Sequence, residues 1–101
     1  MIARVWRASA TPANADAYSR HFAATVVPHL KSIAGHHHAY LLRRPEDGQV
    51  ELLAVTFWDS IDTVKNFAGN NPETAIVDPE ARAMLSEFDG FARNFEVAYR
   101  D

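Results

Sequence analysis

The stretch Glu51-Leu52-Leu53-Ala54-Val55-Thr56-Phe57-Trp58 decides which folds this sequence can adopt. Its aliphatic, β-branched and aromatic residues favour a β-strand. A strand with one face in water alternates apolar and polar residues, because successive side chains point to opposite faces of the sheet. In this stretch both alternating sets are apolar, so both faces of the strand should be covered. One set is Leu52, Ala54 and Trp58, and the other is Leu53, Val55 and Phe57.

Three further strands are expected around this one. Residues 36–44 favour a strand, and Pro45-Glu46-Asp47-Gly48 after them is rich in turn-forming residues, which predicts an antiparallel hairpin with residues 49–58. Residues 2–9 form the first expected strand, and residues 91–100 form the last one, where apolar side chains alternate with polar ones.

A long amphipathic helix is expected between the first strand and the hairpin. Thr11 followed by Pro12 is a helix-start signal, since a hydroxyl can cap the helix and proline fits its first position. Large apolar residues then recur every fourth position as far as Leu30, which predicts one amphipathic helix. Pro28 should kink its last turns, and Gly35 should end it.

A second helix is expected at residues 61–68, with Ser60 as its cap, and a short helical piece should begin at Asp78-Pro79. The order is therefore β-α-β-β-α-β over a single domain, residues 1–101. Right-handed crossovers in this order place both helices on one face of a four-stranded antiparallel sheet. The sequence thus predicts an α+β, ferredoxin-like fold.

The second face of the sheet needs a different cover, because both helices lie on the first. An uncovered apolar sheet face would be an adhesive patch. A second copy of the chain packing sheet to sheet would remove it, and two-fold dimers are the commonest oligomers. We therefore expect a homodimer through the sheet face, with any pocket between the other face and the helices.

Composition narrows the possible partners. The net charge is −3 and the basic residues are scattered, so nucleic acid is not an expected partner. No apolar run approaches the roughly 20 residues that cross a membrane. The first residues have no signal-peptide core, and the chain has no cysteine, which together favour the cytoplasm. A small hydrophobic or aromatic molecule is the better expectation.

The histidines are the most prominent polar feature of the sequence. Strand alternation would place His36 and His38 on one face and His37 on the other. With His29, the first two could offer three nitrogen ligands, but solvated side chains at a strand end are the simpler interpretation, and no metal is expected. A functional alternative makes His38 or His37 a general base, since an imidazole with an ordinary pKa of about 6.5 suits proton removal.

Other candidates for a pocket are mostly aromatic. Asn66, on the second helix, could bind a substrate carbonyl or stabilise an oxyanion, although a solvent-facing amide is the simpler interpretation. Aromatic and aliphatic packing in the core explains the remaining candidates equally well. These candidate pocket residues are Trp58, Tyr40, Phe67, Phe22 and His29.

Several motifs together resemble the antibiotic biosynthesis monooxygenase family. They are Trp58-Asp59-Ser60-Ile61, Phe67-Ala68-Gly69, Val77-Asp78-Pro79-Glu80-Ala81-Arg82 and Phe95-Glu96-Val97. The resemblance implies a dimeric α/β barrel with a pocket between sheet and helices in each protomer. It also implies that the chain could oxygenate an electron-rich aromatic, such as an anthrone or quinol, with dioxygen and without a cofactor.

Two alternatives accompany this resemblance. Haem-degrading relatives resemble one another in a helical tryptophan, where this chain has Phe67, and in a later proximal histidine, whereas this chain has none after His38. Haem binding is therefore not expected. The other alternative is a non-catalytic dimeric barrel that binds a hydrophobic small molecule or serves in a stress response.

Overall fold

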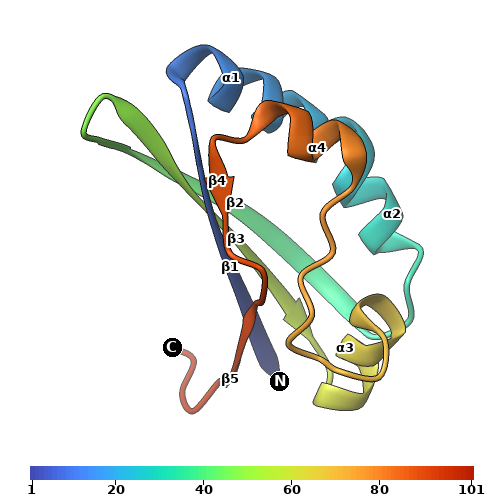
Figure 1. Ribbon diagram of the computed structural model, residues 1–101. Helices are drawn as coiled ribbons and strands as arrows, with labels where there is room; N and C mark the ends of the chain where they lie inside the picture. The colour runs from blue at the N-terminus through green and yellow to red at the C-terminus, as the bar shows by residue number, and fades with distance from the viewer.

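The computed structural model describes residues 1–101 and confirms the α+β fold with β-α-β-β-α-β order. Its antiparallel sheet runs in the order β2-β3-β1-β4, and β5 also pairs with β1. Figure 1 shows all the helices on one side of the sheet. The strands are β1 (Ile2–Ala10), β2 (His36–Glu46), β3 (Gln49–Trp58), β4 (Glu87–Phe88) and β5 (Arg93–Glu96).

The first helix is interrupted near Pro28, as predicted, but by a π turn, and it ends at Lys31, before the expected stop at Gly35. It consists of α1 (Pro12–His21), a π-helical turn η1 (Phe22–Val26) and α2 (Val27–Lys31). Pro28 accounts for the change, because it has no N–H to donate and an α-helical ladder cannot run through it unbroken. In the wider π turn, the Val27 N–H donates to the carbonyl of Phe22 instead.

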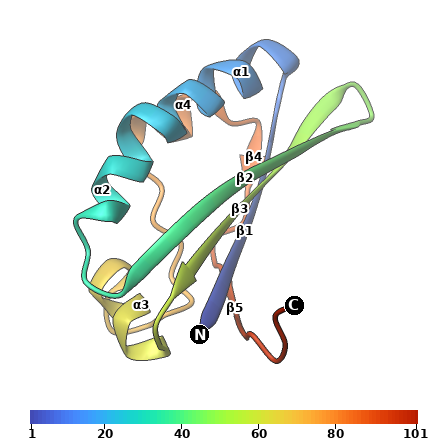
Figure 2. The same cartoon turned by 180° about the vertical axis from the view of Figure 1, so that it is seen from behind.

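The second half of the chain adds two short helices, α3 (Ile61–Ala68) and α4 (Pro79–Met84). Ser60 caps α3 as predicted and forms a capping box with Thr63. Before these helices, the hairpin turns through Asp47 and Gly48, whose φ angles of 51° and 79° are typical of a type I′ turn. Figure 2 shows this hairpin extending beyond the helices.

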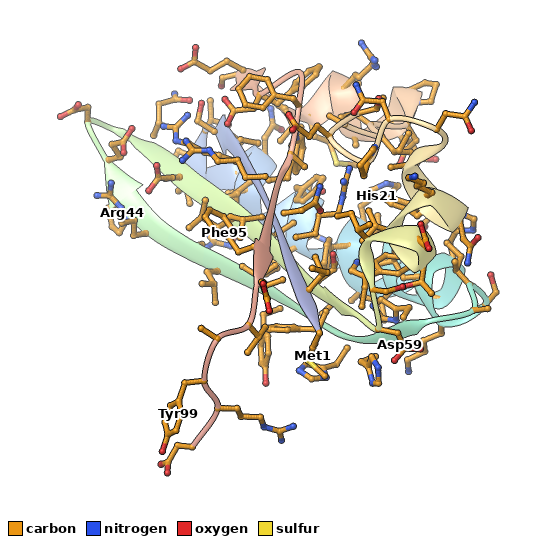
Figure 3. All side chains as sticks on the ribbon, turned by 90° about the horizontal axis from the view of Figure 1, so that it is seen from below. Met1, His21, Arg44, Asp59, Phe95 and Tyr99 are labelled. Atoms are coloured by element: carbon orange, nitrogen blue, oxygen red, sulfur yellow. The ribbon has the colours of Figure 1, made fainter.

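The last strand does not span the expected residues 91–100. It is split into β4 and β5, and the backbone of residues 90–92 between them hydrogen-bonds to residues 73–75 instead of β1. The strand also ends early, because Glu96 lies opposite Ile2, where β1 begins and the pairing stops. Tyr99 is 84% exposed on the tail that leaves the sheet (Figure 3).

The helix-facing side of the sheet holds the core. Trp58 is fully buried there with Leu30 of α2 and Val64 of α3, and Leu52 and Ala8 are fully buried in a second cluster with Tyr18 of α1. On the opposite side, Tyr40, Leu42 and Phe95 are 54%, 49% and 50% exposed, so an apolar face of the sheet stays uncovered in a single chain. We call this side the open face. None of the helices is long and apolar enough to cross a membrane.

The contact between Gly35 and α3 predicts a difference between two glycine substitutions. Gly35 and Gly48 both have positive φ, but a Cβ at Gly35 would lie 2.3 Å from the Cβ of Thr63, whereas nothing lies within 4 Å at Gly48. Gly48→Ala should lower the free energy of unfolding by about 1 kcal/mol through backbone strain. Gly35→Ala should lower it by roughly 3 kcal/mol or more, because overpacking adds to that strain. Urea denaturation of both variants measures the difference, and equal losses would contradict the close approach.

Candidate functional site

An apolar cavity lies between the helix-facing side of the sheet and the helices. Ten of its 13 lining residues are hydrophobic. Thr56 and Arg4 line it from the sheet, Tyr18 and Phe22 from α1 and η1, and Phe67 from α3. Its enclosed part has about 60 Å³ of space, which is room for only a few water molecules. The cavity is therefore narrow, and a larger ligand would extend out of it.

A wider cleft adjoins the cavity and provides that space. The cleft and the cavity share the side chains of four residues, Val26, Phe67, Ile76 and Asp78. The cleft also borders His21 and His29, and it encloses about 580 Å³, a volume within the usual range of small-molecule sites. We call this outer space the mouth. An elongated or multi-ring molecule could thus place one end in the cavity and the rest in the mouth.

At the mouth, buried His21 pairs with two carboxylates that are themselves exposed to solvent. Its side chain is only 3% exposed, with Nε2 3.0 Å from Asp78 Oδ2 and Nδ1 3.0 Å from Glu80 Oε2. Both nitrogens can donate at once only when the ring carries both protons. Figure 3 shows His21 among the helices, away from Arg44 on the hairpin.

Asp78, which is partly exposed, connects this group of residues to the cavity. Its Oδ1 accepts the Ala81 N–H at 2.8 Å and so caps α4, while its other oxygen meets His21. Burial alone would raise the pKa of Asp78, but the hydrogen bonds from His21 and the Ala81 amide outweigh burial, and the pKa falls below its usual value. Nearby, burial and then the charge of Asp78 raise the pKa of Tyr18 to about 12, so its hydroxyl keeps its proton.

Arg4 is the buried cation of the cavity. The residue is only 4% exposed. Its guanidinium donates to the carbonyls of Pro72 and Thr74 and lies 5.6 Å from the centre of the Phe67 ring. No carboxylate lies within ion-pair distance of it. Burial lowers the pKa of Arg4 to about 10, which still leaves it charged at neutral pH.

Three of the five aromatic and histidine residues expected at a pocket border these spaces. Phe22 and Phe67 line the cavity, and His29 lines the mouth with its ring 6.1 Å from that of Phe67. Trp58 lies behind Phe67, stacked on it at 5.9 Å, and its indole N–H donates to Thr56. Trp58 thus supports the wall without forming it. Tyr40 lies on the open face, on the other side of the sheet.

The three consecutive histidines do not alternate as expected. A β-bulge lies between His36 and Ala39, where β2 has one more residue than β3. Consequently His36 packs edge-on against buried Trp58, whereas His38 stacks on Phe57 at 4.6 Å on the open face. The prediction that these two share a face is therefore wrong, because the extra residue reverses the alternation.

None of the three histidines lines the cavity or the mouth. His37 pairs with Asp59 at an exposed position, and burial, together with its charged neighbours, lowers the pKa of His36. No three His, Cys, Asp or Glu side chains gather in a way that could hold a metal ion. Asn66 also lies outside the cavity, and its amide donates to the Ala34 carbonyl at 3.1 Å, which joins α3 to the turn before β2.

Sequence reasoning missed Arg4, His21 and Asp78 as site residues, although the sequence holds a signal for two of them. Arg4 shares strand parity with Ile2 and Trp6, so it is a charge on an otherwise apolar strand face. His21 lies three residues after Tyr18, within the apolar stripe of α1. A charged or titratable residue inside an apolar stripe needs a buried partner or a ligand. Asp78 was predicted only as a helix start.

Comparison with known proteins places the chain in a protein family. A family model described as antibiotic biosynthesis monooxygenase matches residues 1–85. The match covers the chain from β1 to α4 and includes every residue that lines the cavity and the mouth. Only β4, β5 and the C-terminal tail lie outside it. None of the curated proteins matches the chain.

The lowered pKa of Asp78 predicts a pH dependence of stability. An acid whose pKa is lower in the folded chain stabilises the fold above its unfolded pKa, about 3.9, and this contribution is lost as pH falls through the folded pKa. Asp78→Asn keeps a capping side chain but removes the charge. We expect the variant to lose less stability than the parent chain between pH 5 and pH 3, measured by urea denaturation. Asp62→Asn, on an exposed turn of α3, is the control, and an identical acid sensitivity of parent and Asp78→Asn would contradict the assignment.

Proposed function

The chain belongs to the antibiotic biosynthesis monooxygenase family, and on that basis we propose that it oxidises an electron-rich aromatic small molecule with dioxygen as the only co-substrate. An anthrone or a dihydroquinone has the required chemistry. The observation that supports this proposal is the apolar cavity with the His21–Asp78 pair at its edge. An aromatic ring fits the apolar walls, and the pair offers a proton acceptor beside it.

The proposed reaction needs little from the protein beyond a base and a dry cavity. The base removes a proton from the substrate, and the resulting anion passes one electron to dioxygen. The two radicals then combine to a peroxide anion, which takes the proton back from the base to become a hydroperoxide and then loses water to leave a carbonyl. Overall, the CH₂ group of an anthrone and O₂ give a C=O group and H₂O, and a dihydroquinone and O₂ give a hydroxyquinone and H₂O, so the substrate supplies all the electrons. Apolar walls keep water away from the reactive anion.

Asp78 is the proposed proton acceptor. It lines the cavity, and its carboxylate is ionised at neutral pH, so it can take a proton. His21 holds it by a hydrogen bond of 3.0 Å. Phe22 and Phe67 form aromatic walls for the substrate ring. We assign the base to Asp78 in preference to His37 or His38, because both histidines lie away from the cavity.

Oxygen uptake with a panel of anthrones and dihydroquinones tests this proposal. Asp78→Asn should lower the rate of substrate-dependent uptake by about 100-fold or more, the usual contribution of a general base. His37→Gln and His38→Gln are matched controls and should keep the parent rate within about twofold. Thermal melting of each variant checks that it is folded.

Two outcomes of this experiment would overturn the proposal. The first is a loss of activity in His38→Gln with full activity in Asp78→Asn, which would place the base on the other side of the sheet. The second is tight binding of panel compounds with no oxygen uptake by the parent chain. That result would favour the alternative function, a barrel that binds a hydrophobic molecule without turning it over.

We also propose that a second copy of the chain covers the open face. Tyr40, Leu42 and Phe95 are about half exposed there, and His38 and Phe57 extend the same face through their stacked rings. A contiguous apolar face of this kind marks an interaction site in a folded protein. A two-fold dimer joins identical patches, and dimerisation is the family's usual arrangement.

A charge placed on the open face should separate the dimer. Leu42→Arg introduces a cation at the centre of the proposed interface, where a buried unpaired charge is strongly unfavourable. We expect the parent chain to sediment as a dimer and Leu42→Arg as a folded monomer in analytical ultracentrifugation. Ile61→Arg, which changes a partly exposed residue of α3, is the control and should remain dimeric. A monomeric parent chain, or a dimeric Leu42→Arg, contradicts the proposed interface.

A further inference from the structure

Arg4 is a buried charge that the proposed reaction does not use. The side chain lines the inner cavity, and its residue is 4% exposed. Asp78 lines the same cavity but pairs with His21, not with Arg4. Burying an unpaired ion is costly, and proteins normally offset that cost with a counter-charge. The chain itself supplies none here, so the counter-charge is open to a ligand.

We propose that Arg4 binds an anionic oxygen carried on the aromatic ring of the ligand, either a phenolate or a carboxylate. The inference rests on the proposed function only in taking the cavity as the ligand site. Both oxygen anions share the chemistry that a guanidinium recognises, namely negative charge with lone pairs for its N–H donors.

The hydrogen bonds of Arg4 fix its position and leave donors free. A guanidinium carries five N–H donors, and the bonds to Pro72 and Thr74 use two of them. The Phe67 ring lies beside the same group. The cation is therefore held in place before any ligand arrives, and an incoming oxygen meets a donor that needs little reorganisation.

A purely structural role explains less of what is observed. Arg4 does connect β1 to the turn at residues 72–74, but this connection does not require a charge. Asn94, which lies opposite Arg4 in the β1–β5 register, donates to the same Pro72 carbonyl at 3.0 Å with a neutral amide. A neutral donor thus already holds the Pro72 carbonyl, whereas a cation in an apolar cavity is not explained by the turn.

The binding of a ligand oxygen by Arg4, which we call the anchor, also has a chemical consequence for a phenolic substrate. A nearby cation stabilises the phenolate relative to the phenol and so lowers the pKa of the bound hydroxyl group. A phenolate is more electron-rich than its phenol and gives an electron to dioxygen more readily. Arg4 would then select ionisable aromatic molecules and also make them easier to oxidise. The substrate class of the proposed reaction is thus narrowed to phenols and aromatic acids.

Binding of three small probes tests the anchor without turnover. Titration calorimetry at pH 8 compares 4-nitrophenol, which ionises, with benzoate and with 4-nitroanisole, an ether that cannot ionise. We expect the parent chain to bind at least one of the oxygen anions about 10-fold or more tightly than the ether, as a charge-assisted hydrogen bond requires. Arg4→Met should remove this preference, Arg4→Lys should keep part of it, and Arg43→Met, which removes a surface arginine, should leave it unchanged.

Absorbance provides a second measurement that does not depend on the variants. The phenolate of 4-nitrophenol absorbs visible light, so its bound pKa can be followed directly. We expect binding to the parent chain to lower the pKa of 4-nitrophenol by about one pH unit, which is equivalent to a 10-fold preference for the anion. Arg4→Met should bind with no such shift. Should that variant fail to fold, the parent chain and Arg4→Lys still provide the comparison.

The outcomes separate the anchor from the proposed function. A preference for 4-nitrophenol alone assigns the site to phenols, and one for benzoate alone assigns it to aromatic acids. Equal affinity for the anions and the ether overturns the proposal. So does the absence of binding of either anion at millimolar concentration. A preference for the anion over the ether that survives in Arg4→Met overturns it as well. Because 4-nitrophenol is electron-poor and resists oxidation, a failure of oxygen uptake leaves these results intact, and the reverse also holds.

Discussion

The strand at the centre of the sheet has apolar side chains on both faces, and the arrangement of the whole chain follows from that constraint. Water must be excluded from both faces of β3, since each exposed apolar area carries a free-energy cost. The helices satisfy one face and bury Leu52 and Trp58 completely. The other face keeps Leu42 and Phe95 half exposed in a single chain. Core, cavity and proposed partner surface are thus consequences of one stretch of sequence.

The cavity exists because the cover over this sheet is assembled from separate pieces. The π turn at residues 22–26 changes the course of the first helix and places Phe22 and Val26 on the cavity wall. A short loop and α4 close the opposite side, where Asp78 begins the helix and meets His21. A single straight helix would have packed more closely on the sheet. Irregular elements therefore provide both the space and the polar groups at its edge.

Sequence patterns predicted the fold well, because strand alternation and helical periodicity are local properties. Strand alternation correctly divided β3 into its two faces, and the Ser60 cap was correctly placed. The histidines were misjudged because a bulge depends on how two strands pair, which one strand's sequence does not contain. Arg4 was missed for a similar reason. Its partners lie 68 and 70 residues away, and only the folded chain brings them together.

The acceptors that hold Arg4 are main-chain carbonyls, and this detail separates two parts of the site. A carbonyl accepts a hydrogen bond whatever side chain its residue carries, so many substitutions at Thr74 would preserve the position of the cation. The mouth, in contrast, is lined by side chains such as Thr25 and His29, which do not line the inner cavity and can change without disturbing it. Proteins with this arrangement can vary the side chains of the mouth, and with them the shape of the ligand, while they keep the Arg4 cation in the inner cavity. Specificity and chemistry would then evolve on different residues.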